Sequence, residues 1–310
     1  MSFQFFRLVS TIMRSVESLR ADRDLRNGVA MRHKLRLAGF LMTVSVAGFA
    51  QLPQSERIPR IEEMKGKTIL LFTPHPDDDA FCCAGTLALL AQNGNRIHVV
   101  IYTNDDKGSY DPEMTSERLA RIRKSEEEAG NAVVGVPSQN LLWLGHHDGM
   151  LEYVDSKSLV EQVTGIIRKY RPDVVLTVDP GAGHVRWHKT DHRMAAMNTL
   201  DAIRAAEWHL YFPNQRLQQG LEPWRVPELL FFYVLDDAAN VWVNIDSTLD
   251  KKIAASLSHV SQFEPGVHKY RPDWQPQDRK KAEEEVKSMI MHRDGHAVEA
   301  FRYATEFNQY

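Results

Sequence analysis

The stretch of sequence that decides the fold is Thr68-Ile-Leu-Leu-Phe-Thr-Pro-His-Pro-Asp-Asp-Asp79. Its apolar half predicts a buried β-strand ending at the Pro-His-Pro turn, and the Ala-, Gly- and Leu-rich segment after the aspartates predicts a helix. Open α/β sheets bind ligands at the carboxyl ends of their strands, which is where this order places the His and the aspartates. Three clustered carboxylates need a compensating cation or proton, so the stretch predicts a metal site.

Strands and helices continue to alternate beyond this stretch. We expect strands at 68–73, 96–103, 141–144 and 173–178, and helices at 79–92, 115–133, 158–170 and 193–208. The helix at 158–170 is expected to open with a capping box formed by Ser158 and Glu161. This alternation indicates an α/β, Rossmann-like, doubly wound fold with a mostly parallel sheet.

After residue 208 the regular alternation of strands and helices ends. We expect the elements that follow to complete the same domain. We expect an irregular stretch at 213–227, two more strands at 229–234 and 241–245, and helices at 247–262 and 282–291. Hydrophobic residues make up 43% of the sequence and charged residues 25%, which are ordinary globular values. The net charge of −3, with no long basic run, gives no support for a nucleic-acid partner.

The N-terminal region has the layout of a secretory signal peptide. The basic stretch Met31-Arg-His-Lys-Leu-Arg36 precedes an apolar segment that runs from Leu37 to small residues at Ala50. This segment is short for a membrane-spanning helix, which needs about 20 residues. We therefore expect a signal peptide at 31–50, cleavage near Ala50, and no stable membrane span afterwards.

The domain organisation and the location of the protein follow from that reading. Residues 1–50 form an N-terminal extension with its signal peptide, residues 51–66 form a linker, and residues 67–310 form the globular domain. If translation starts at Met31, we expect an exported protein, periplasmic or extracellular. If it starts at Met1, the extension is an amphipathic helix and the protein is cytoplasmic.

Two clusters of potential metal ligands each follow a predicted strand. They are His75, Asp77 and Asp78, and His188, Asp191 and His192. Neighbouring parallel strands open onto one crevice at their carboxyl ends, so the two clusters can meet there. Two imidazoles and one carboxylate form the ligand set of an open catalytic zinc site, and a further carboxylate can act as general base. The same ligands also accept iron(II) or cobalt(II).

These residues resemble the motifs of the LmbE-like, or PIG-L-like, zinc-dependent N-acetylglucosaminyl deacetylases. Pro74-His-Pro-Asp-Asp78 is similar to the opening motif of that family, and Asp191-His192, with His188 upstream, is similar to its second motif. Lesser similarities lie in Arg123 with Glu126, Asp148-Gly149, Arg171-Pro-Asp-Val-Val175 and His259-x-Ser-Gln262. The resemblance covers about residues 67–265.

The resemblance implies a role for each matched residue. The implied zinc ligands are His75, Asp78 and His192, with Asp77 as the general base. His188 would stabilise the oxyanion or protonate the leaving amine, and Asp191 would orient it. Arg123 and Asp148 would contact the substrate, a small molecule or glycoconjugate that carries an N-acetylated amino sugar.

Two departures from the family pattern affect this reading. The family spaces its second-motif histidines three residues apart, whereas His188 and His192 are four apart. On a helix both would still share a face, but in a loop His184 becomes the substitute for His188. The family also has Glu where this chain has Asp79, which either changes the outer shell of the site or starts a helix at the surface.

The function expected from the sequence is a metal-dependent amide hydrolase that removes the N-acetyl group from an N-acetylglucosamine-type sugar or its conjugate. A divalent-metal phosphoesterase is an alternative, but the loop at 104–112 offers only Lys107 to grip a phosphate. A non-catalytic carbohydrate-binding metal module is a second alternative. The spare carboxylate of Asp77 argues against it, because a closed site needs no base.

Overall fold

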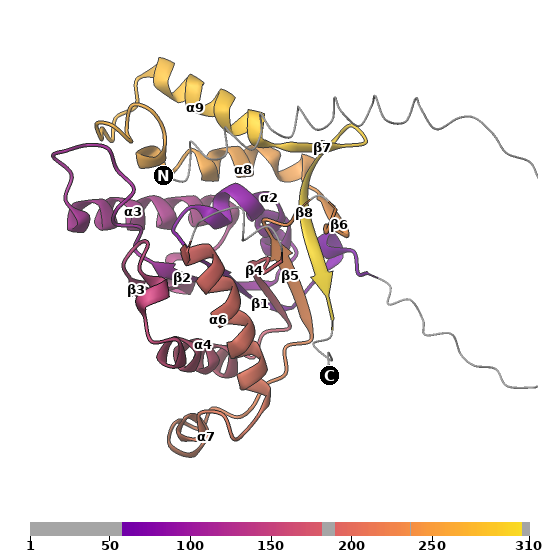
Figure 1. The fold of residues 1–310 in the computed structure, drawn as a ribbon. Coiled ribbons are helices and arrows are strands. Elements are labelled where there is room, and N and C mark those ends of the chain that lie inside the picture. The colour runs from indigo at the N-terminus through magenta and orange to yellow at the C-terminus, as the bar shows by residue number, and fades with distance from the viewer. Residues whose placement is uncertain (1–57, 182–189, 236, 306–310) are drawn as a thin grey trace, which may run out of the picture. The chain divides into compact units, whose positions relative to one another are not determined.

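The computed structural model describes residues 58–181, 190–235 and 237–305. The predicted signal peptide, residues 51–57 of the predicted linker, His184 and His188 lie outside these residues. The described chain has the predicted α/β architecture, a mostly parallel sheet with helices on both faces (Figure 1). No helix in this part of the chain combines the length and the apolar character that a bilayer span requires.

The sheet has a parallel half and an antiparallel extension. Its parallel strands lie in the order β3 (Leu141–His146), β2 (Arg96–Thr103), β1 (Thr68–Thr73), β4 (Val174–Val178) and β5 (Glu228–Phe232). The sheet then continues through β8 (His296–Ala304), which pairs antiparallel with β5, β6 (Val241–Asn244) and β7 (Met291–Arg293). The C-terminal strands thus complete the same domain, as predicted.

Helices cover the two faces of this sheet. One face carries α2 (Asp78–Gln92), α3 (Ser116–Val134) and α8 (Leu249–Ser256), with α9 (Pro276–Met289) packed on α8, and the other carries α4 (Ser156–Tyr170) and α6 (Thr190–Glu207) (Figure 1). The short helix α7 (Pro213–Gln219) follows α6. Single 3₁₀ turns lie at Ile61–Glu63, Ser138–Asn140, Leu151–Tyr153, Asp246–Thr248 and Val260–Gln262.

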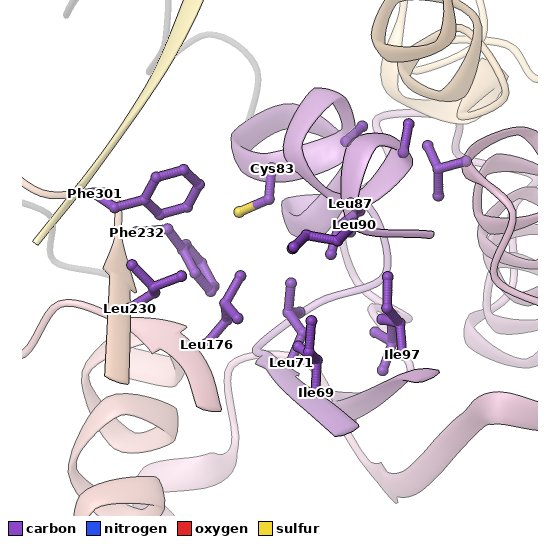
Figure 2. Close-up of a cluster of buried hydrophobic side chains, with 14 of the residues drawn as sticks. Ile69, Leu71, Cys83, Leu87, Leu90, Ile97, Leu176, Leu230, Phe232 and Phe301 are labelled. Carbon is purple, nitrogen blue, oxygen red and sulfur yellow. The ribbon is translucent and has the colours of Figure 1, made fainter. Parts of the chain in front are cut away.

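The alternation of side chains along β1 builds one core on each face. Ile69 and Leu71 pack with Leu87 of α2, in the cluster drawn in Figure 2. Leu70 and Phe72 point the other way, into the cluster that includes residues of α4 and α6. Because successive side chains of a strand face opposite sides, a strand buried on both faces has an apolar run, as β1 has from Ile69 to Phe72 between its two buried threonines.

The strand order predicts a ligand-binding position beside β1. From β1 the chain moves outward through β2 and β3, then returns to add β4 on the other side of β1. Ligands bind in open α/β sheets at such a reversal, outside the carboxyl ends of the two strands that flank it. The Pro74-His-Pro turn follows β1, and α6 follows β4, so the two predicted clusters arise from the two sides of the crevice.

Several local predictions were wrong. Helix α4 begins at Ser156 and is capped by Asp155, whose carboxylate accepts the Ser158 amide, so Ser158 and Glu161 form no capping box. The single helix expected at 247–262 is α8 flanked by two 3₁₀ turns, and β7 and β8 were not anticipated. The two adjacent cysteines, Cys82 and Cys83, form a disulfide with each other within α2.

Candidate metal centre

Three predicted ligands converge at the crevice between β1 and β4. The carboxylate oxygen Oδ2 of Asp78 lies 3.1 Å from Nδ1 of His75 and 3.1 Å from Nε2 of His192. All three side chains are buried, and one donor atom from each lies within 4.8 Å of the others. In a tetrahedral site with bonds of about 2.0–2.1 Å, neighbouring ligand atoms are about 3.3 Å apart. The donor set and its spacing therefore fit a divalent metal ion.

Local structure explains why these side chains meet. His75 occupies the turn that ends β1, and Asp78 is the first residue of α2. His192 lies in the first turn of α6, which begins at Thr190, three residues earlier than the sequence predicted. Its ring faces that of His75, with the ring centres 5.2 Å apart.

Tyr233 contacts two of the three potential ligands, Asp78 and His192, and was not predicted from the sequence. Its hydroxyl donates to Oδ1 of Asp78 at 2.8 Å, and its ring stacks on His192 with the centres 5.5 Å apart. This bond leaves Oδ2 of Asp78 turned toward the two histidines. Tyr233 directly follows β5, whereas the strand predicted at 229–234 placed it inside the strand, so the sequence carried no signal for it.

Asp77 occupies an unusual backbone conformation beside the ligands. Its φ angle is 129°, a value that residues with a Cβ atom rarely adopt, and its side chain is buried. Its Oδ2 atom has no hydrogen-bond partner among the described residues. Burial raises the pKa of Asp77 well above its ordinary value, and the charges of Asp78 and Asp105 add to this effect. Strained backbone and unpaired buried groups of this kind concentrate at functional sites.

Asp191 and Asp148 lie on the other side of the His75 ring. Each places a carboxylate oxygen 3.2 Å from Nε2 of His75. Asp191 also accepts the amides of Gly149 and Leu151, at 2.6 and 3.1 Å, and so joins the start of α6 to the Asp148 loop. Burial alone would lower the pKa of His75, but its hydrogen bonds to Asp148, Asp191 and Asp78 outweigh burial and raise it.

Arg123 is close to the centre, but its guanidinium is engaged by the protein itself. It pairs with the carboxylate of Asp105, donates to Gly108 O at 2.7 Å, and lies 3.4 Å from Ser261 Oγ. Its side chain is 2% exposed. The structure therefore shows Arg123 holding the loop after β2, and its predicted contact with a sugar stays a prediction.

Two of the lesser motifs, Glu126 after Arg123 and Ser261-Gln262, are joined by hydrogen bonds around Arg123. Glu126 accepts the amide of Ser261 at 2.8 Å and its hydroxyl at 2.7 Å. Gln262 donates to the Asp105 carboxylate at 3.2 Å. The 3₁₀ turn after α8 is thereby fixed to α3 and to the loop after β2, although 135 positions separate Glu126 from Ser261.

Asp79 is buried, so a helix-start role for it at the surface was wrong. Its carboxylate accepts Asn131 Nδ2 of α3 at 3.0 Å, and burial raises its pKa to about 6. Glu127 is fully buried in the same region, and burial, with the nearby charge of Asp79, raises its pKa well above the ordinary value. Asp79 thus belongs to a polar layer between α2 and α3, behind the first turn of α2.

Asp106 was also missed by the sequence analysis. Its carboxylate accepts the amide of Asp148 at 3.1 Å and is 2.7 Å from Nδ1 of His147, which fixes the Asp148 loop from the side opposite Asp191. A second group of potential metal ligands consists of His75, Asp105 and Asp148. Because Asp105 is already paired with Arg123, the centre formed by His75, Asp78 and His192 fits a cation better.

The fold and this ligand set define an α/β protein with a candidate divalent-metal centre at the carboxyl edge of its sheet. The chain matches the family described as GlcNAc-PI de-N-acetylase (PIG-L) over residues 70–203. A diacetylchitobiose deacetylase of Thermococcus kodakarensis is 30% identical over 213 residues, which cover 68% of this chain and 74% of that protein. A 1D-myo-inositol 2-acetamido-2-deoxy-alpha-D-glucopyranoside deacetylase of Mycobacterium sp. (strain KMS) is 24% identical over 67% of this chain and 76% of its own.

The chain therefore belongs to the PIG-L, or LmbE-like, family. The named relatives are deacetylases, enzymes that hydrolyse a carbon–nitrogen amide bond. Solved structures share the fold: N,N'-diacetylchitobiose deacetylase from Pyrococcus horikoshii has a TM-score of 0.66 at 24% identity, covering 77% of this chain and 84% of that one. The hydratase GalB from Pseudomonas putida has a TM-score of 0.60 at 18% identity, covering 79% and 98%. The fold thus hosts more than one reaction, and the site must decide the function.

Proposed function

We propose that this protein is a zinc-dependent de-N-acetylase that hydrolyses the acetamido group of an N-acetylglucosamine-type sugar or its conjugate. The observation that carries this proposal is the convergence of His75 Nδ1, Asp78 Oδ2 and His192 Nε2 next to Asp77, whose buried Oδ2 atom has no hydrogen-bond partner among the described residues. His75, Asp78 and the proposed base Asp77 come from the turn between β1 and α2, so the backbone fixes their relative placement, and His192 joins them from α6.

In this proposal His75, Asp78 and His192 hold the ion. A divalent ion bound there supplies Lewis-acid chemistry, acidifying a water molecule and polarising the amide carbonyl. Zinc suits two imidazoles and a carboxylate, and iron(II) or cobalt(II) also accept this set. Tyr233 holds the second oxygen of Asp78, and Asp191 and Asp148 face the remaining nitrogen of His75, so the ligands are oriented from behind.

Asp77 is the proposed general base. Its Oδ2 has no partner in the described chain, and its raised pKa, caused mainly by burial, brings its proton affinity closer to that of a group that works near neutral pH. It would take the proton of the attacking water. His188 would then protonate the departing amine or stabilise the oxyanion, with His184 as the alternative if the loop places it closer.

The two relatives named above indicate the class of substrate. One is named for diacetylchitobiose and the other for a 2-acetamido-2-deoxy-glucopyranoside of inositol, so both names denote an N-acetylated amino sugar with a different group attached. We take the acetamido sugar as the shared feature and leave the attached group unspecified. In this proposal Asp148 contacts a sugar hydroxyl, and the 21% exposure of its side chain beside the buried ligands supports that role.

The test is acetate release from diacetylchitobiose and from N-acetylglucosaminyl inositol, measured with metal-loaded wild-type protein and with Asp77→Asn. We expect release by the wild type and a loss of about 10²–10⁴-fold in Asp77→Asn, which retains all three ligands. Phosphate release from p-nitrophenyl phosphate is assayed in parallel. Phosphate release without acetate release would favour the phosphoesterase alternative and overturn the proposal.

We also propose that the protein is exported after cleavage near Ala50, as the layout of residues 31–50 suggests. The test is N-terminal sequencing of protein purified from its native source, together with fractionation of the cells. An N-terminus close to Gln51 in the exported fraction would support the proposal. An intact Met1 in the cytoplasmic fraction would exclude it.

A further inference from the structure

A buried ion pair is inserted beside the backbone of α2, the helix that begins with Asp78. Glu299 of β8 and Lys252 of α8 lie 2.6 Å apart, and both side chains are almost fully buried. The carboxylate of Glu299 accepts the backbone amides of Gly85 and Thr86, at 3.0 and 2.7 Å. The ammonium group of Lys252 donates to the carbonyl oxygen of Phe81 at 2.8 Å.

The ion pair contacts the two backbone groups that one hydrogen bond of the helix would join, the amide of Gly85 and the carbonyl of Phe81. In a regular α-helix the amide of residue i donates to the carbonyl of residue i−4, so Gly85 would donate to Phe81. Here Glu299 accepts the amide and Lys252 donates to the carbonyl, and the two charges then pair with each other. The ion pair therefore bridges the same two backbone groups that one helical hydrogen bond would join.

The bridged residues adjoin the proposed metal centre. The amide of Phe81 donates to Asp77 O at 3.0 Å, which closes the first turn of α2. That turn carries Asp77, with its φ of 129°, and the ligand Asp78. The turn is thus held at its start by β1 and at its end by the Lys252 contact to Phe81.

Helix α8 reinforces this contact along α2. Thr248, just before α8, donates to Gly85 O at 2.8 Å, and Ser256 of α8 lies 3.5 Å from Ala80 O. Lys252 and Glu299 make the charged contacts of this set, because they pair with each other and also form hydrogen bonds with three backbone groups of α2. Removing one partner leaves the other buried without compensation.

We propose that Lys252 and Glu299 are positioning residues that set the first turn of α2, and with it the placement of Asp78 and Asp77, for metal binding and catalysis. This inference rests on the proposed metal centre. Neither residue touches the centre, and each acts through the backbone between Phe81 and Thr86.

The experiment measures Co²⁺ binding by the full-length chain, because the visible absorption of bound Co²⁺ reports its coordination geometry independently of activity. The variants are Lys252→Met, Glu299→Gln and Glu299→Asp. Glu299→Asp keeps the charge and shortens the arm, so it decides the question if the other two fail to fold. We expect each folded variant to lose about 10–100-fold in Co²⁺ affinity and to change its absorption bands, as outer-shell changes do.

Arg168→Met is the matched control. Arg168 of α4 is also a buried cation that donates to backbone carbonyls, among them Ala205 O and Trp208 O at 2.9 Å, but it lies on the other face of the sheet. We expect this variant to lose thermal stability while its Co²⁺ affinity stays within about twofold of the wild type.

The outcomes separate the two proposals. Wild-type protein that binds no divalent metal would contradict the proposed function before any variant is compared. Wild-type binding together with unchanged affinity and unchanged absorption in Glu299→Asp and in the other folded variants would overturn the positioning role. Affinity losses of equal size in Arg168→Met would do the same, because the effect would then be one of general stability.

Discussion

The Nε2 atom of His75 lies 3.2 Å from a carboxylate oxygen of Asp191, a residue 116 positions further along the chain. The other ring nitrogen, Nδ1, faces Asp78. A carboxylate that accepts the Nε2 proton fixes the tautomer in which Nδ1 carries the free lone pair. Asp191 is itself held by two backbone amides, so the ring of His75 is oriented by a rigid acceptor.

The first prediction is that Asp191→Asn weakens metal binding. The substitution removes one of the two carboxylate charges that face Nε2 of His75, the other being that of Asp148, and we expect about 10–100-fold lower affinity for zinc in a competition titration against a chromophoric chelator. Asp106→Asn is the matched control, because Asp106 fixes the same loop without contacting His75. Equal losses in the two variants would mean that Asp191 acts only by fixing the loop.

A second prediction concerns the strained backbone of Asp77. Glycine adopts a φ of 129° without a Cβ penalty, and such strain costs on the order of 1–3 kcal/mol. After subtracting the entropy that glycine adds to the unfolded chain, we expect Asp77→Gly to be more stable than Asp77→Asn by about 1 kcal/mol. Both variants lack the carboxylate, so urea unfolding of the two isolates the backbone contribution. An Asn variant of equal or higher stability would show that the turn carries no such strain.

The third prediction is a pH dependence of stability that arises from Glu126. Burial raises the pKa of this carboxyl from 4.5 to about 7, although its bonds from Ser261 and the charge of Arg123 lower it. Between these two values the folded state binds more protons than the unfolded state, so stability falls as the pH rises through this window. The stability that the neutral Glu126 carboxyl contributes is fully present below about pH 4.5 and is lost above about pH 7.

Replacing Glu126 by Gln removes this titration while keeping a group that can accept from Ser261. We expect the difference in unfolding free energy between wild type and Glu126→Gln to change by about 2–3 kcal/mol in favour of the variant from pH 4.5 to 7.5. Urea unfolding at four pH values between these limits measures it. A difference that does not vary with pH would show that Glu126 titrates normally.

The fourth prediction addresses the histidine of the second motif. If His188 is the proton donor, His188→Ala lowers kcat by about 10²–10⁴-fold with little change in KM or in bound metal. His184→Ala then retains activity near that of the wild type. The reverse pattern in steady-state assays of the two variants would assign the role to His184.

Strands β1 and β4 could be predicted closely from sequence because their residues are buried on both faces. The predicted bounds of β1 and β2 match the structure, since the apolar run 69–72 and the run 99–102, rich in β-branched residues, are followed by a proline turn and a polar loop. Strand β8 could not be predicted in this way. It carries Glu299 into the interior, and the partner that makes this possible, Lys252, is 47 positions away.

The candidate site was predictable where chemistry and strand ends coincide, as at His75 and Asp78. Asp105, Asp106 and Tyr233 also follow strands, but they lack a recognisable motif, and their importance appears only in their contacts with Arg123, Asp148 and Asp78. The burial of Asp79 was equally hidden, because a short acidic residue at a helix start is as common on the surface.

The position of β1 in the sheet has a consequence for how the protein opens locally. β1 is paired on both sides, with β2 and β4, and it packs against a core on each face. Amide hydrogen exchange is slowest in segments of this kind, which open only when the whole domain unfolds. The ligand-bearing turn is rooted in that strand. The turn that carries His75 and Asp78 is therefore expected to keep its structure when less protected parts of the described chain open.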